Sequence, residues 1–168
     1  MLDVKTSPGA FMKSEQDARA LARTMVDLGK DHGVDTVALL TDMSRPLGRT
    51  VGNALEVRES VEVLAGGGPA DVVELTLALA REMLQAAGSD ADPEKALADG
   101  SAMDAWKQMV RAQGGDPEAE LPWAKETEDV VAERDGVLTQ LDAMAVGVAA
   151  WRLGAGARSE ERRVGKEC

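Results

Sequence analysis

The first 42 residues carry the pattern that most constrains the fold: an apolar strand, an amphipathic helix and a second apolar strand. Residues 1–5 read as a strand that leads at once into a turn containing glycine and proline. Residues 34–41 contain the continuous apolar run Val37-Ala38-Leu39-Leu40, which favours a strand covered on both faces, as in a parallel sheet. Between them, apolar residues recur at helical spacing at Ala18, Leu21, Ala22, Met25, Val26 and Gly29. The pattern predicts a β-α-β unit with a right-handed crossover.

This unit predicts where a ligand would bind. Its two strands point the same way, so the loops that follow them, residues 6–13 and 42–52, emerge on one edge of the sheet. Ligands of open α/β sheets bind at that carboxyl edge. We therefore expect a functional site where these two loops meet.

Downstream, the hydrophobic period is mostly helical. It predicts helices beginning near Val57, Val72, Pro93 and Ser101. Two short strands, Thr127–Glu133 and Val137–Leu141, are expected to form a hairpin around Arg134-Asp135-Gly136. A final amphipathic helix is expected from Ala143 to Leu153.

These elements predict an α/β fold, part of a mixed sheet flanked by helices, followed by the start of an α+β C-terminal domain. The α/β part covers residues 1–115, and the acidic, proline-containing residues 116–126 form a linker. Residues 127–157 begin the second domain. Residues 158–168 lose all hydrophobic period, so we expect a non-native or disordered tail.

Composition excludes several functions. The net charge of −11 repels phosphate backbones, and one Phe, three Trp and no Tyr build no stacking platform, so we expect no nucleic-acid partner. One histidine and one cysteine exclude clusters of such metal ligands. There is no secretory signal and no apolar run of about 20 residues, so we expect a cytoplasmic protein without a membrane partner.

Two segments resemble signatures of the thymidine/pyrimidine-nucleoside phosphorylases. Residues 3–12, D-V-K-T-S-P-G-A-F-M, resemble the D-V-K-x-G-x-G-A-F-M segment of that family. Residues 41–57, T-D-M-S-R-P-L-G-R-T-V-G-N-A-L-E-V, resemble its T-D-M-x-x-P-L-G-x-x-V-G-N-A-L-E-V signature. Shorter similarities extend the resemblance over about residues 1–157. It implies a nucleoside phosphorylase/phosphoribosyltransferase-like fold.

The resemblance implies an activity as well. Members of the family are glycosyltransferases, specifically pentosyltransferases, that use inorganic phosphate to cleave pyrimidine nucleosides such as thymidine to the free base and (deoxy)ribose 1-phosphate. Full-length members are homodimers. Their catalytic motifs, a Lys/Ser/Thr-Gly-Gly phosphate loop and a Ser-x-x-x-Lys pair among them, precede the D-V-K strand and do not occur in this sequence. We therefore expect a C-terminal fragment that is inactive alone, with the catalytic residues upstream of Met1.

Four site positions carry over by resemblance. Phe11 matches an aromatic that lines the pyrimidine pocket, and its alternative is a core side chain. Leu47, Thr50 and Glu59 match positions that hold a potassium ion in some members, the first two through backbone carbonyls. Oxygen ligands suit such a hard cation. The alternative for Glu59 is a solvated helix carboxylate.

One departure affects the first loop. The G-x-G of the family is Ser7-Pro8-Gly9 here, so Pro8 offers no N–H and Ser7 lacks the freedom of glycine at positive φ. Two other functions stay open: a non-catalytic acidic α/β interaction module, and a phosphoribosyltransferase relative of the same fold. The T-D-M-x-x-P-L-G signature points away from the second. The sequence leaves thymidine or uridine preference open.

Overall fold

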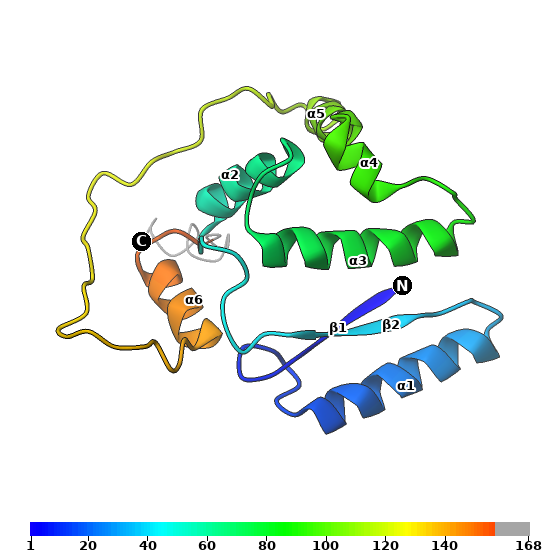
Figure 1. Cartoon of the computed structure of the whole chain (residues 1–168). Helices are drawn as coiled ribbons and strands as arrows, with labels where there is room; N and C mark the ends of the chain where they lie inside the picture. Colours follow the sequence, from blue (N-terminus) through cyan, green and yellow to red (C-terminus); the bar gives the residue numbers. More distant parts are fainter. Residues whose placement is uncertain (157–168) are drawn as a thin grey trace, which may run out of the picture.

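The predicted β-α-β unit is present in the computed structural model, which describes residues 1–156. Strands β1 (Leu2–Thr6) and β2 (Ala38–Asp42) pair in parallel, with Leu2 opposite Ala38 and Thr6 opposite Asp42. Helix α1 (Glu15–Asp31) connects them and covers one face of the pair (Figure 1). Within the described part of the chain, the sheet consists of these two strands.

Local signals set the ends of α1, and small side chains set its packing. The Ser14 hydroxyl accepts the N–H of Asp17 at 3.1 Å, and Gly33 follows the helix with φ +70°. Ala18 and Ala22 are buried against Val4 of β1. Because these alanines are small, the helix approaches the strands closely.

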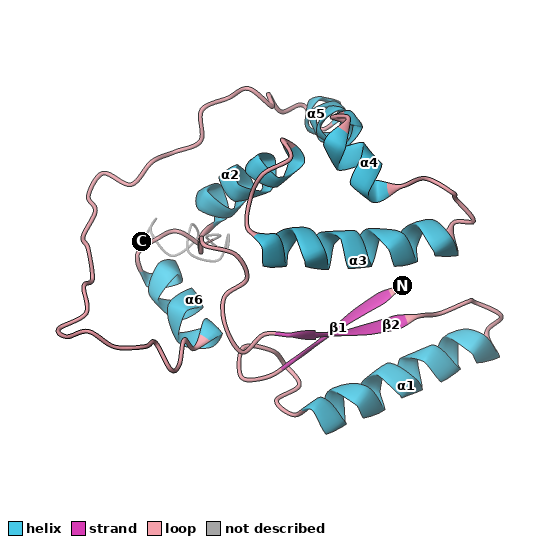
Figure 2. Cartoon of the chain, in the orientation of Figure 1, coloured by secondary structure: helices cyan, strands magenta, loops and turns pink. Residues whose placement is uncertain are grey.

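The predicted helices downstream are present. They are α2 (Asn53–Leu64), α3 (Ala70–Ala86), α4 (Pro93–Ala98) and α5 (Ser101–Ala112). In α4, the Asp92 carboxylate caps the first turn and Pro93 occupies its first position, as expected. In Figure 2, α3 lies between the strands and the other three of these helices.

The predicted hairpin is wrong. Residues 113–142 contain neither helix nor strand, although α6 (Ala143–Arg152) follows as predicted. Val130 and Val137 are 97% and 88% exposed, so the apolar side chains meant for the hairpin face solvent. A two-stranded hairpin is marginal unless a third strand or a helix packs on it, and no described element does. The domain division at residues 116–126 stays a prediction, and the tail 158–168 lies outside the described residues.

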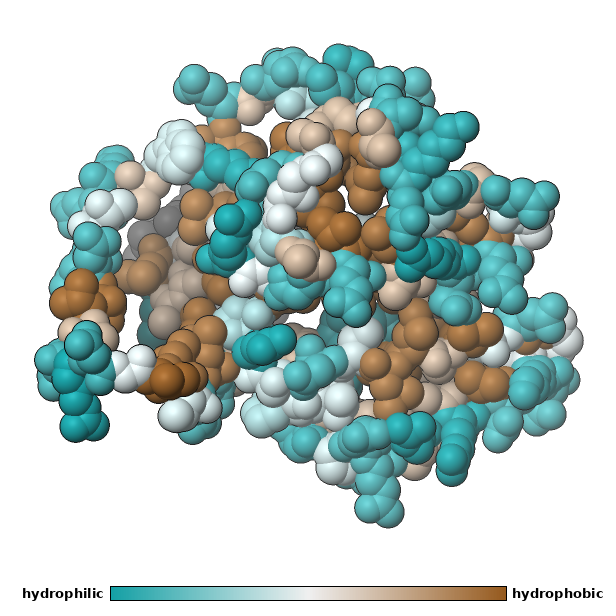
Figure 3. Space-filling view, viewed as in Figure 1, coloured by the Kyte–Doolittle hydropathy of each residue, from teal (hydrophilic) through white to brown (hydrophobic). Residues whose placement is uncertain are grey.

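Much apolar surface is left uncovered. The buried hydrophobic residues of the described part are only Val4, Ala10, Ala18, Ala22 and Val63. Figure 3 shows hydrophobic residues reaching the surface in the middle of the molecule, framed by hydrophilic ones. Exposed apolar patches of this kind occur at surfaces that contact another molecule. No helix within residues 1–156 is long and apolar enough to cross a membrane.

Candidate functional site

The loops after β1 and β2 meet at the carboxyl edge of the strands, as the topology predicts. The N–H of Met43 donates to the carbonyl of Thr6 at 2.9 Å, and the N–H of Gly9 donates to the carbonyl of Met43 at 3.1 Å. The Ser7 hydroxyl donates to Asp42 Oδ1 at 2.5 Å. Direct hydrogen bonds thus join two segments that lie 35 residues apart.

Asp42 is the charged centre of this junction. Its carboxylate accepts the Ser44 hydroxyl at 2.6 Å and the Ser44 N–H at 3.0 Å, in addition to the Ser7 hydroxyl. The hydrogen bond from the Ser44 hydroxyl, followed by the bonds from the Ser7 hydroxyl and the Ser44 N–H, holds the pKa of Asp42 below its usual value. The carboxylate therefore remains ionised and orders both loops at neutral pH.

Ser7 occupies a conformation that favours glycine. Its φ is +85°, and it is the one non-glycine residue at positive φ among residues 1–156. Such a conformation costs about 1–2 kcal/mol for an L-residue. The hydroxyl bond to Asp42 and the turn bond from the Ala10 N–H to the Ser7 carbonyl at 2.9 Å offset that cost. The first loop thus keeps the backbone shape of a glycine although the glycine is absent.

Phe11 is not a core residue. It is 91% exposed at the end of the first loop, so the core interpretation is wrong. A large apolar ring at the edge where ligands of α/β sheets bind offers a flat stacking surface.

A second cluster forms where the loop after β2 folds over α2. Glu59 is only 7% exposed, so the interpretation as a solvated carboxylate is wrong. The N–H of Arg49 donates to Glu59 Oε1 at 3.0 Å. Gly48 has φ +71°, and a Cβ on it would lie 2.1 Å from Glu59 Oε2. The loop therefore fits tightly around the carboxylate.

Asp71, at the start of α3, holds the other side of this loop. The N–H of Gly48 donates to Asp71 Oδ2 at 3.1 Å, and this bond holds the pKa of Asp71 below its usual value. The Arg49 guanidinium lies 3.1 Å from Glu62 Oε1 and 4.0 Å from Glu59 Oε1. Two carboxylates thus anchor the backbone amides of consecutive loop residues.

The donors around Glu59 fit a hard cation. Thr50 Oγ1 is buried and has no hydrogen-bond partner, and Thr50 follows directly on the loop residue bound to Glu59. Leu47 precedes Gly48 and is half exposed. Carbonyl, hydroxyl and carboxylate oxygens are the ligands that alkali and alkaline-earth ions prefer. Nowhere in residues 1–156 do three His, Cys, Asp or Glu side chains gather to hold a metal.

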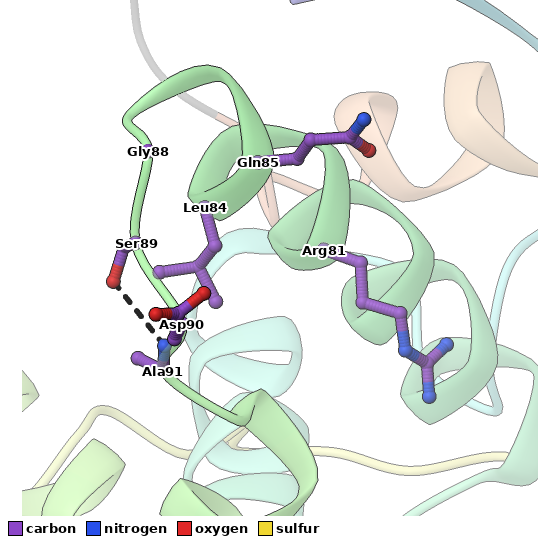
Figure 4. A pocket seen from close by; sticks show the side chains of 7 residues that line it. All are labelled: Arg81, Leu84, Gln85, Gly88, Ser89, Asp90 and Ala91. Carbon is purple, nitrogen blue, oxygen red and sulfur yellow. Dashed lines mark hydrogen bonds between the residues drawn. The ribbon is translucent and has the colours of Figure 1, made fainter.

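A separate hollow lies at the C-terminal end of α3 and contains none of the predicted site residues. Its lining comes from α3 and the loop after it: Arg81, Leu84, Gln85, Gly88, Ser89, Asp90 and Ala91 (Figure 4). Arg81 pairs with Glu94 of α4, and the N–H of Ala91 donates to the Ser89 hydroxyl at 3.3 Å. Its polar groups serve local structure, and we assign it no ligand.

Sequence reasoning missed the role of α6 beside these loops. The N–H of Ala143 donates to the carbonyl of Ser44 at 3.3 Å, and the N–H of Asn53 donates to the carbonyl of Ala155 at 2.8 Å. Both contacts use backbone atoms of residues about 100 positions apart. No side-chain pattern announces such contacts.

The fold and the two joined loops define an α/β domain, and comparison with known proteins gives its family. The model for the α/β domain of the glycosyl transferase family matches residues 1–104. The chain therefore belongs to this glycosyl transferase family.

Individual relatives confirm the resemblance found in the motifs. The chain is 59% identical over 165 residues to the thymidine phosphorylase of Mycobacterium tuberculosis (strain ATCC 25618 / H37Rv). It is 44% identical over 176 residues to the pyrimidine-nucleoside phosphorylase of Geobacillus stearothermophilus. Each match covers 98% of this chain, which spans 39% and 41% of the length of these two relatives.

The catalytic groups were expected upstream of Met1, and that expectation stays a prediction. Met1 is partly buried and directly precedes β1, whose carboxyl end carries the first site loop. At the junction of the loops, the carboxylate of Asp42 already accepts three hydrogen bonds from Ser7 and Ser44. These side chains hold the loops together, and we assign none of them a catalytic role.

Proposed function

We propose that this chain supplies part of the active site of a pyrimidine-nucleoside phosphorylase. The observation that carries the proposal is the junction of the two loops at the carboxyl edge, because both loops bear the phosphorylase signatures. In the proposed reaction, a phosphate oxygen bonds to the anomeric carbon as the bond from that carbon to the base nitrogen breaks. The base leaves with the electron pair and takes up a proton.

In this proposal the residues of the chain bind and orient rather than carry out chemistry. Phe11 stacks against the pyrimidine at the carboxyl edge. Asp42 keeps the two loops together, so that the ring and the second loop face the same substrate. Positioning of this kind lowers the entropic barrier of a reaction between two bound substrates.

The cluster around Glu59 is the proposed potassium site. Leu47 and Thr50 would contribute backbone carbonyls and Glu59 its carboxylate. The buried, unpartnered Thr50 hydroxyl and the low exposure of Glu59 support this assignment. A bound cation would neutralise the buried carboxylate and fix the loop over it. The complete enzyme is proposed to be a cytoplasmic homodimer that uses inorganic phosphate as its co-substrate.

The test replaces the matching segment of the M. tuberculosis thymidine phosphorylase by residues 1–156 of this chain. We expect the chimera to convert thymidine to thymine only when phosphate is present. The chain by itself should give no turnover, because the phosphate loop and the Ser-x-x-x-Lys pair are absent from its sequence. A folded chimera without phosphorolysis, or turnover by the chain alone, would contradict the proposal.

Phe11→Ala in the chimera tests the stacking role. We expect KM for thymidine to rise about tenfold with little change in kcat, because a lost aromatic contact of about 1.4 kcal/mol weakens nucleoside binding. The matched control is Leu138→Ala, which removes another large and mostly exposed apolar side chain, 74% exposed, outside the two loops. Equal effects of the two variants on KM would refute the role of Phe11.

A further inference from the structure

Helix α6 is tied to the second site loop at both of its ends. At its start, the N–H of Ala143 donates to Ser44, where the loop begins. Beyond its end, the carbonyl of Ala155 accepts the N–H of Asn53, where the loop passes into α2. In Figure 1, α6 lies beside the chain that connects β2 with α2. The helix therefore spans the loop from one end to the other.

Small residues surround both attachments of α6. A Cβ on Gly9 would lie 3.1 Å from the Cβ of Ala143, and a Cβ on Gly52 would lie 2.8 Å from the Cβ of Ala155. The more buried side chains of α6 share one helical face and are mostly small: Ala143, Val146, Gly147 and Ala150. Small residues on both partners let the helix end and the loop backbone come within hydrogen-bonding distance.

Residues 44–53, which we call the bracketed loop, contain the backbone amides that bind Glu59 and Asp71. The two hydrogen bonds that attach this loop to α6 lie at its two ends, on either side of the contacts with Glu59 and Asp71. A loop fixed at both ends has few conformations left to lose when it binds a ligand. The connection to α6 is itself anchored, because Arg58 Nη2 donates to the carbonyls of Leu121 and Pro122 at 2.7 and 2.8 Å.

We propose that α6 is a positioning element that holds the bracketed loop against Glu59 through the backbone bonds of Ala143 and Ala155. This inference deepens the proposed function, on which its importance for phosphorolysis rests. The coupling between α6 and the loop is a property of the chain itself. This coupling can therefore be measured without nucleoside or phosphate.

Ala143→Pro removes one attachment and leaves the helix intact. Ala143 is the first residue of α6, where the helix does not use the N–H, and Asp142 before it has ψ 115°, which suits a following proline. The measurement is amide hydrogen exchange in the chain at neutral pH. We expect the N–H groups of Arg49 and Asn53 to exchange roughly fivefold faster, the factor that corresponds to one lost hydrogen bond of about 1 kcal/mol.

The matched control is Glu15→Pro, the same change at the first position of α1. Ser14 before it has ψ 147°, so the backbone there accepts proline equally well. We expect Glu15→Pro to leave exchange at Arg49 and Asn53 unchanged. Equal acceleration by both variants, or none in Ala143→Pro with its helical circular dichroism preserved, would overturn the proposal.

A second variant addresses the other attachment and serves if Ala143→Pro does not fold. Ala155→Leu drives a larger side chain toward Gly52, and Ala149→Leu adds the same bulk on the exposed face of α6. Ala155→Leu should accelerate amide hydrogen exchange at Asn53, and Ala149→Leu should leave it unchanged. Equal exchange in these two variants would also overturn the proposal. An inactive chimera would refute the phosphorolysis proposal and leave this exchange result standing.

Discussion

Removing the Glu59 carboxylate is the sharpest test of how the second loop is held. Glu59→Ala deletes a buried acceptor that binds the Arg49 N–H at 3.0 Å. A hydrogen bond to a charged group contributes about 1.5–3 kcal/mol. The one lost methylene group adds about 0.8 kcal/mol of burial. We expect a fall of about 3 kcal/mol in the free energy of unfolding.

Glu59→Gln separates the shape of this side chain from its charge. The amide oxygen still accepts the Arg49 N–H, but a neutral bond is weaker by about 1 kcal/mol. The Arg49 guanidinium, 4.0 Å away and 64% exposed, adds little to the difference. Glu59→Gln should therefore cost about 1 kcal/mol, roughly a third of the effect of Glu59→Ala.

Glu62→Ala is the matched control for these variants. Glu62 lies one turn further along α2 and pairs with the same Arg49 at 3.1 Å, but its side chain is 53% exposed. Exposed ion pairs contribute less than about 1 kcal/mol. The assay is urea unfolding followed by circular dichroism. Equal losses in Glu59→Ala and Glu62→Ala would refute the claim that the loop closes over a buried carboxylate.

Three more changes test other parts of the structure. Val4→Ala removes two carbons from the small core beneath α1 and should lower the free energy of unfolding by about 2 kcal/mol in urea titrations. Gly48→Ala should lower the free energy of unfolding by about 3 kcal/mol, because the new Cβ would meet the Glu59 carboxylate. Gly88→Ala, at φ +64° in open space, should lower it by only about 1 kcal/mol in the same assay. Because the folded-state pKa of Asp42 is below its ordinary value of 3.8, its stabilisation is complete above that pH and is lost as the pH falls through the lower value. In acid unfolding experiments, the Asp42→Asn variant should lack this loss of stability at low pH. The same acid transition in both proteins would refute the stabilising role of Asp42.

The sequence predicts the parts of this fold that rest on periodic, local signals. The helical spacing from Ala18 to Gly29 predicts α1, and the continuous run at Val37–Leu40 predicts a parallel strand, β2, although its side chains are only half-buried in the structure. The direction of parallel strands then places both site loops on one edge. These conclusions need no knowledge of tertiary contacts.

What the sequence does not predict depends on distant partners. The short apolar run within Thr127–Glu133 resembles a strand, but an isolated hairpin is stable only where another strand or a helix packs on it. The burial of Glu59 follows from a loop that folds back over α2, and the period of that helix does not contain this information. The link between α6 and the bracketed loop uses backbone atoms, which every residue except proline shares.

Nucleoside phosphorolysis is the function proposed for the joined loops of this chain. The most direct measurement is thymine release by the chimera of the M. tuberculosis thymidine phosphorylase that carries residues 1–156 of this chain, with and without inorganic phosphate. We expect phosphate-dependent formation of thymine together with deoxyribose 1-phosphate. A folded chimera that binds thymidine and phosphate yet forms neither product would contradict it.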